Sequence, residues 1–304
     1  MIERLISGSS GKLQLAHEGS PVDWLRCDNP TDDEKSFLVG LGIDVDLLND
    51  ALDPHEVPRL EFAGDWTYFI MRVPSIKDDF GDWTTPILFA FNSQVLVTIS
   101  RDDLSQLWQP FIGNTTITTG LRRRLFLMMV DFIAQSYQNR VAQINRQMRA
   151  LADNISKTYS KEITQVVEYE RKLNDYLDSL IPTNTALERL LNKESFEFGE
   201  DNADEIEDLS IDFEQVIARC KSLLRTIQND RDSYRAVMDT RLNETMRALT
   251  IITVTLTIPT MLAGLLGMNV KLPFNINSEL TFWGIVAVSV IASLSVSLYF
   301  NKRQ

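Results

Sequence analysis

A stripe of mostly polar side chains runs through an otherwise apolar segment near the C-terminus. Its members recur at alternating spacings of three and four residues: Asn243, Met246, Thr250, Thr253, Thr257 and Thr260. This spacing places them on one face of a helix. Hydroxyl groups on an apolar helix contact either a neighbouring helix or water. The stripe therefore predicts either a packing face or the wall of a pore, and the spacing leaves both alternatives open.

A run of carboxylates upstream of that segment is the second feature that could bind a ligand or an ion. Eight acidic residues fall within residues 194–208, and no Lys or Arg interrupts them. Such a run is typical of a solvated surface or a flexible loop. Carboxylate oxygens are also the ligands that hard divalent cations prefer. The run is therefore compatible with a solvated face and with a surface that attracts divalent cations.

The composition excludes several functional classes. The 304 residues carry 30 Lys and Arg against 42 Asp and Glu, a formal net charge of −12, so we expect no nucleic-acid partner. Cys27 and Cys220 are too few for a disulfide scaffold and fit a reducing compartment. His17 and His55 do not suit a His-rich zinc site. We find no phosphate-binding loop or nucleophile motif and expect the chain not to be an enzyme.

Two long uncharged stretches end the chain. No charged residue lies between Arg247 and Lys271, a gap of 23 residues, or between Glu279 and Lys302, a gap of 22. A helix of ~20 residues crosses a ~30 Å hydrocarbon core. We therefore expect membrane spans at residues 249–268 and 280–300, rather than a buried hairpin of a soluble protein. Pro259 interrupts the backbone hydrogen bonds of the first span, because it has no N–H to donate to a carbonyl one turn earlier. Hydroxyls or close neighbours can supply that carbonyl with another donor.

The flanking charges predict the orientation of the spans. Basic residues lie before the first span and after the second: Arg241, Arg247, Lys302 and Arg303. The connecting loop, residues 269–279, carries only Lys271 and Glu279. The positive-inside rule places the N-terminal body and the tail, residues 301–304, in the cytoplasm. We therefore expect a multi-pass protein of the plasma (inner) membrane, embedded in the lipid bilayer with its loop outside.

Residues 1–118 predict a cytoplasmic α/β domain. Short runs rich in β-branched and aromatic residues predict strands, at residues 12–17, 22–27, 59–62, 66–73, 86–91 and 94–99. Thr31 and Glu34 form a capping box that begins a helix extending to about Leu41. Residues 44–52 predict a further short helix.

Residues 119–202 predict a region of long antiparallel helices. The first spans residues 121–154; the second spans residues 161–181, where Pro182 ends it, and a shorter helix follows at residues 185–191. From Ala203 onward no Gly or Pro occurs before Pro259. We therefore expect a stalk helix over residues 203–248 that continues into the first span, ~100 Å long in all.

The motif Gly267-Met268-Asn269 lies at the outer end of the first span. It resembles the signature of the CorA family of divalent-cation transporters. Further matches accompany it: Asn243-Glu244-Thr245-Met246, Leu249-Thr250-Ile251-Ile252, Pro259 and Ala263-Gly264. The order of the α/β body, antiparallel helices, stalk and two C-terminal spans is also similar, so the resemblance covers the whole chain.

The resemblance implies a homopentamer with a central pore lined by the first span. Gly267, Met268 and Asn269 would form the selectivity filter, and Met246 and Leu249 an apolar gate. The polar stripe would then be the pore wall, from Asn243 through Thr250, Thr253, Thr257 and Thr260. The resemblance implies influx of Mg²⁺ driven by the membrane potential, with Co²⁺ and Ni²⁺ as further candidate ions.

The resemblance also implies regulation by intracellular Mg²⁺ bound between neighbouring protomers. Asp50 matches the family's carboxylate from the first domain, and Asp208 matches the one from the stalk. Asp232 matches a second stalk carboxylate. A dication would neutralise these groups and join the protomers, so its loss would loosen the ring and open the gate.

Departures in the outer loop leave the choice of cation open. Val270 follows the motif where the family often has an aromatic residue, and Ser278-Glu279 stands where a Pro-Glu pair is common. One alternative is a zinc transporter of the related ZntB type. Another is a membrane-tethered divalent-cation sensor or scaffold that transports nothing.

Overall fold

The computed structural model describes most of the chain, namely residues 2–7, 12–16, 21–75, 83–114, 122–154, 159–191, 200–268 and 279–301. The chain forms two compact units, Met1–Ile227 and Gln228–Gln304.

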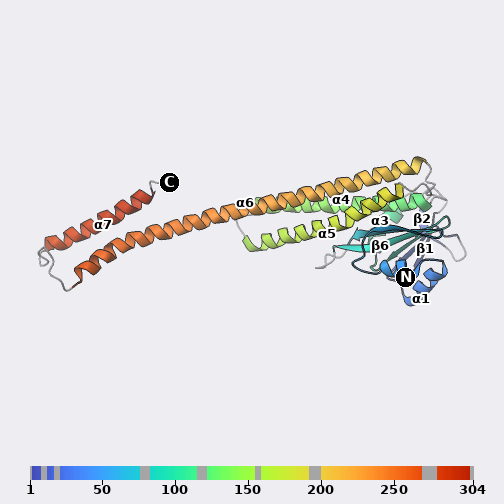
Figure 1. The fold of residues 1–304 in the computed structure, drawn as a ribbon, viewed down its shortest axis with the longest axis horizontal. Helices are drawn as coiled ribbons and strands as arrows, with labels where there is room; N and C mark the ends of the chain where they lie inside the picture. Colours follow the sequence, from blue (N-terminus) through green and yellow to red (C-terminus); the bar gives the residue numbers. More distant parts are fainter. Residues whose placement is uncertain are drawn as a thin grey trace. The chain divides into compact units, whose positions relative to one another are not determined.

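A seven-stranded sheet lies at the centre of the first unit, among the residues described (Figure 1). Its order is β2-β1-β3-β7-β6-β5-β4, and β3 and β7 are the parallel pair in an otherwise antiparallel sheet. The strands are β1 Ile2–Ser7, β2 Leu13–Leu15, β3 Trp24–Asp28, β4 Arg59–Ala63, β5 Trp66–Pro74, β6 Thr84–Phe91 and β7 Leu96–Ser100. The pattern predicted β2 to β7 but missed β1, whose charged Glu3 and Arg4 interrupt its apolar residues.

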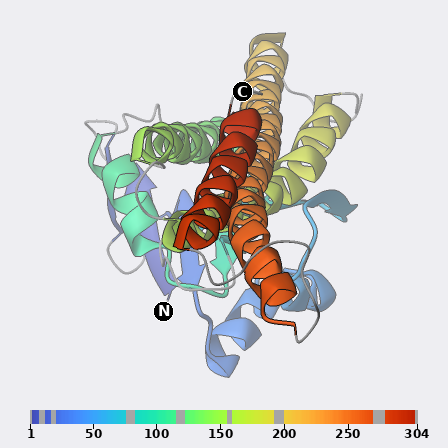
Figure 2. The same ribbon diagram turned by 90° about the vertical axis from the view of Figure 1, so that its left-hand side faces the viewer.

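Helices cover both faces of this sheet (Figures 1 and 2). The helices are α1 Asp32–Gly40, α2 Val45–Asp50, α3 Ser105–Asn114, α4 Arg122–Asn154, α5 Tyr159–Leu191, α6 Glu200–Leu266 and α7 Glu279–Asn301. Tyr68 and Ile70 on β5 belong to the core under α1 and α2. Phe69 and Met71 alternate with them and belong to the core shared with α3, α4, α5 and the first part of α6.

The capping box at the start of α1 is confirmed. The Thr31 hydroxyl accepts the Glu34 N–H at 3.3 Å, and the Glu34 carboxylate accepts the Thr31 N–H at 2.9 Å. Two amide donors that the first helical turn leaves without helical partners are satisfied in this way.

The prediction that Pro182 ends a helix is wrong. Residues 161–181 and 185–191 belong to the single helix α5, with Pro182 inside it. Leu180 before the proline and Leu187 and Leu190 after it are all buried in the same core. Tertiary packing on both sides therefore offsets the ~3 kcal/mol that an interior proline costs. The Thr183 hydroxyl also donates to the Ser179 carbonyl at 2.7 Å.

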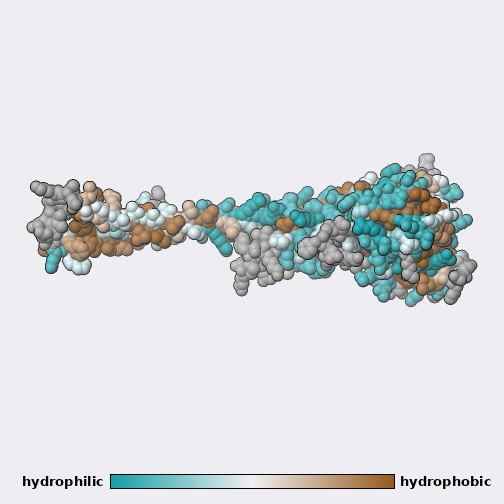
Figure 3. All heavy atoms as spheres, turned by 90° about the horizontal axis from the view of Figure 1, so that it is seen from below, coloured by the Kyte–Doolittle hydropathy of each residue, from teal (hydrophilic) through white to brown (hydrophobic). Residues whose placement is uncertain are grey.

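The second unit contains the rest of α6 and the whole of α7. Both helices are long and apolar enough to cross a membrane. Brown, apolar side chains cover much of this hairpin in Figure 3, whereas teal, hydrophilic side chains predominate on the first unit. α6 begins at Glu200, three residues before the predicted start, and passes through Pro259 without ending.

Candidate ion pathway and regulatory carboxylates

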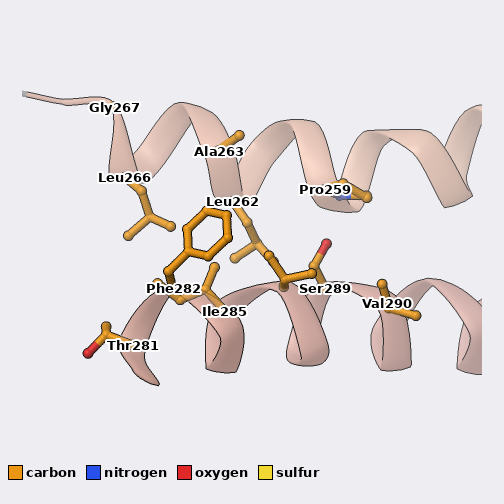
Figure 4. Close-up of a pocket in the computed structure, with 11 residues that line it drawn as sticks. Pro259, Leu262, Ala263, Leu266, Gly267, Thr281, Phe282, Ile285, Ser289 and Val290 are labelled. Carbon is orange, nitrogen blue, oxygen red and sulfur yellow. The ribbon is translucent and has the colours of Figure 1, made fainter. Parts of the chain in front are cut away.

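The two candidate spans lie side by side (Figures 1 and 2). A cavity of about 610 Å³ separates part of α6 from α7. Leu262 and Leu266 of α6 meet Phe282 and Ile285 of α7 there, and the Ser289 hydroxyl points towards α6 (Figure 4). This apolar lining marks the face of α6 that belongs to the hairpin.

The threonine stripe lies on the part of α6 that α7 leaves open. Thr250, Thr253, Thr257 and Thr260 are exposed, whereas the residues that line the cavity towards α7 are other members of α6. Each hydroxyl donates to the carbonyl four residues earlier, at 2.7–2.8 Å. The hydroxyl hydrogens are therefore used inside the helix, and the oxygens present lone pairs outward. Asn243, Met246 and Leu249 are exposed as well.

Pro259 leaves one carbonyl of α6 without its helical donor. An N–H at position 259 would bond to the Thr255 carbonyl, but proline has none. The Ser293 hydroxyl of α7 donates to that carbonyl at 3.1 Å. A neighbouring helix thus supplies the missing hydrogen bond, as expected for a proline in a membrane helix.

The signature motif follows the end of α6. The Gly267 N–H donates to the Ala263 carbonyl at 2.9 Å, and a Cβ at Gly267 would lie 3.3 Å from that oxygen. Glycine therefore permits a close approach that alanine would have to relieve by a small shift. Met268 is exposed, and Glu279 is an exposed residue in the first turn of α7. Asn269, the proposed filter ligand, lies outside the described residues.

Asp50 is held by an arginine of its own protomer. It ends α2, and its Oδ2 lies 2.6 Å from Nη2 of Arg59 on β4. The same guanidinium pairs with Glu56 and Glu61. A metal ion at Asp50 would therefore have to compete with Arg59, whose pairing no motif in the sequence indicated.

Asp208 lies on α6 beside a small cavity of about 210 Å³. Asp131 of α4 and Asp212 of α6 line the same cavity, as does Arg124, which pairs with Glu205 at 3.7 Å. Burial, with a smaller contribution from the charge of Asp212, raises the pKa of Asp131 above its usual range. Asp208 thus lies near two further aspartates, with one arginine lining the same cavity.

Asp50 and Asp208 are not brought together within one protomer. Asp50 belongs to α2, which packs on one face of the sheet, whereas the part of α6 that carries Asp208 packs on the other. Asp232 is exposed in the second unit and pairs with Arg235 at 3.9 Å. Within the described residues, no three His, Cys, Asp or Glu side chains are grouped to hold a metal ion.

Comparison with known proteins identifies relatives over nearly the whole chain. A model of the family described as CorA-like Mg²⁺ transporter protein matches residues 20–303. The cobalt/magnesium transport protein CorA of Methanocaldococcus jannaschii is 24% identical over 300 residues, covering 95% of this chain and 93% of that protein.

Solved structures with the same fold include full-length and partial relatives. The complete structure of the CorA magnesium transporter from Methanocaldococcus jannaschii has a TM-score of 0.85 at 23% identity and covers 100% of this chain and 98% of its own. The ZntB cytoplasmic domain from Vibrio parahaemolyticus has a TM-score of 0.64 at 11% identity, covering 78% and 99%. The ZntB domain is therefore the more distant of these two structures.

The fold and the family model agree. The structure combines an α/β domain, long helices and two candidate membrane helices, as in the CorA structure. Transporters of this family are membrane proteins and not enzymes. Because the family model matches nearly the whole sequence, the chain belongs to the family of CorA-like Mg²⁺ transporter proteins.

Proposed function

We propose that the chain forms a homopentameric channel for Mg²⁺, with the first span around the pore and Gly267, Met268 and Asn269 as its filter. The channel lies in the plasma (inner) membrane with both termini in the cytoplasm. The membrane potential drives influx, because moving a dication across 100 mV is worth ~4.6 kcal/mol, twice the ~2.3 kcal/mol for a unit charge. Co²⁺ and Ni²⁺ are the further ions we expect to pass.

The orientation of the threonine hydroxyls carries this proposal. Mg²⁺ dehydrates reluctantly and keeps several waters. Those waters donate hydrogen bonds outward, so a matching wall must accept them. The four threonine oxygens, whose hydrogens are donated within α6, are acceptors of this kind. Their exposure in the hairpin leaves them free to line a pore when several copies assemble.

The regulatory half of the proposal concerns the contacts between protomers. Asp50 and Asp208 lie on opposite layers of one protomer, so a shared Mg²⁺ requires two copies. Asp131, Asp208 and Asp212 line one small cavity, and a dication bound there would offset their mutual repulsion. Asp232 is a second candidate ligand on α6. Bound Mg²⁺ would therefore hold the ring closed.

Ion uptake by the reconstituted full-length chain tests the proposed function. Proteoliposomes with an inside-negative potential should take up Mg²⁺, read with an enclosed dye. Uptake of Zn²⁺ without Mg²⁺ would favour a zinc transporter instead. A folded oligomer that passes neither ion would favour the membrane-tethered sensor or scaffold that transports nothing.

Replacing Asp50 and Asp208 together by asparagine should remove inhibition by internal Mg²⁺. Uptake would then continue at internal concentrations that close the wild type, because the interface lacks its charged ligands. Titration of internal Mg²⁺ in the same vesicles measures this effect. Asp46→Asn with Asp204→Asn is the matched control, since it removes equal charge from exposed positions of α2 and α6. Unchanged inhibition in the Asp50/Asp208 variant would refute the regulatory site.

A further inference from the structure

The contact between Ser293 and the Thr255 carbonyl joins the two candidate spans at one defined point. Ser293 is 8% exposed, although most of α7 is exposed in the hairpin. Its hydroxyl bonds to α6, whereas the Ser295 hydroxyl bonds within α7, to the Ile291 carbonyl at 2.7 Å. Ser293 therefore links the two helices, whereas Ser295 bonds only to its own helix.

The carbonyl that Ser293 reaches is the one that Pro259 leaves without a donor. In hydrocarbon no water is present to replace a lost hydrogen bond to this carbonyl, so the carbonyl depends on a donor from the protein. Without a partner, α6 would bend or unwind at this point. The course of residues 260–268, which include Gly267 and Met268, depends on the geometry of this turn.

We propose that Ser293 is a positioning residue for ion conduction, because its hydroxyl supplies the hydrogen bond that the Thr255 carbonyl lacks at Pro259. The bond fixes the direction of the outer end of α6 and so positions Gly267 and Met268 of the signature motif. This inference rests on the proposed function for its effect on transport. The interhelical bond itself can be tested without transport.

A double-mutant cycle separates this role from ordinary packing. Ser293→Ala, Pro259→Ala and the double variant are compared with the wild type in the full-length chain. In the Pro259→Ala background the residue at 259 supplies its own N–H to the Thr255 carbonyl, so Ser293 becomes dispensable. We expect Ser293→Ala to raise the half-saturating external Mg²⁺ concentration about threefold in the wild-type background, the size of an average interhelical hydrogen bond in a membrane protein. It should have no effect beside Pro259→Ala.

Two further variants sharpen the test. Ser293→Thr keeps the hydroxyl and should restore the wild-type value, and Ser295→Ala should match the wild type. A role in packing alone would lower the maximum rate through lost oligomer and leave half-saturation unchanged. Equal effects of Ser293→Ala in both backgrounds, or no effect in either, would overturn the proposal.

Unfolding of the wild type and the three variants of the cycle in SDS provides a readout independent of transport. Ser293→Ala should raise the unfolding equilibrium constant about threefold only where Pro259 is present. If the wild type passes no Mg²⁺ while this pattern holds, the proposed function is refuted and the role of the Ser293–Thr255 hydrogen bond is supported. If uptake is normal and the SDS cycle shows no coupling, the role of that bond is refuted and the channel is supported.

Discussion

Replacing Asn269 by alanine is expected to reduce Mg²⁺ uptake at least about tenfold. In the proposed pentamer the five Asn269 carbonyls accept hydrogen bonds from the water shell of the ion at the outer mouth. A neutral hydrogen bond is worth ~0.5–1.5 kcal/mol, the variant removes the acceptor from all five protomers, and a loss of ~1.4 kcal/mol in total is already tenfold. Dye-reported uptake into proteoliposomes measures the loss.

The same loop offers a matched control for that variant. Asn275→Ala removes an identical side chain six residues beyond the motif and should leave uptake near the wild-type rate. Size-exclusion chromatography of both variants shows whether the oligomer is intact. Wild-type uptake by an intact Asn269→Ala oligomer would place the filter elsewhere.

Replacing Phe126 by alanine is expected to cost the first unit about 3–5 kcal/mol of its free energy of unfolding. Phe126 lies on α4 and is fully buried. Its ring stacks on Phe91 with centroids 4.8 Å apart and meets Phe69 and Phe89 edge-on, each at 5.3 Å. The truncation would leave a cavity between α4 and the sheet and remove these aromatic contacts.

Denaturant unfolding of the full-length chain in detergent measures the loss. Trp24 and Trp108, which are buried in the same core, report it by fluorescence. Phe37→Ala is the matched control, because Phe37 is 39% exposed on α1 and its loss should cost far less. A Phe126→Ala protein as stable as the control would show that this aromatic cluster is not central to the core.

Periodicity and charge predicted much of the fold. The uncharged stretches correspond to apolar helices, and the segment between residues 203 and 259, free of Gly and Pro, lies in one helix. The capping box needed only two residues three positions apart. Local rules predicted no helix at α3, Ser105–Asn114, which has Pro110 inside it. They failed at Pro182, where buried leucines on both sides hold α5 together, and at β1, which depends on pairing with β2 and β3.

The candidate site was predictable to a similar degree. The helical period of the threonine stripe is visible in the sequence. Only the structure shows that the stripe and the face that meets α7 are different faces of α6. Ser293 and Thr255 are 38 residues apart, and no local pattern joins them. Pro259 was the available signal, since a proline in a span predicts that some donor must reach its freed carbonyl. The pairing of Arg59 with Asp50 likewise appears only when β4 is placed beside α2.

The native cysteines permit a direct test of the pore wall without a cysteine-free background. Cys27 and Cys220 are fully buried, and burial raises the pKa of Cys27 to about 11 and that of Cys220 to about 12. Thiolates are the reactive form, so both should be inert to thiol reagents. A cysteine introduced into the first span would then be the reactive group.

The central claim is that the threonine face of α6 lines a water-filled pathway, and thiol accessibility tests it most directly. Thr260→Cys and Leu262→Cys differ by ~3 Å in depth but face nearly opposite sides of the helix, and Leu262 lines the cavity towards α7. A small cationic thiol reagent is applied to both sides of the vesicles. We predict that Thr260→Cys reacts at least about tenfold faster than Leu262→Cys and that its modification blocks Mg²⁺ uptake. Faster reaction at Leu262→Cys, or modification of Thr260→Cys that leaves uptake unchanged, would contradict the account.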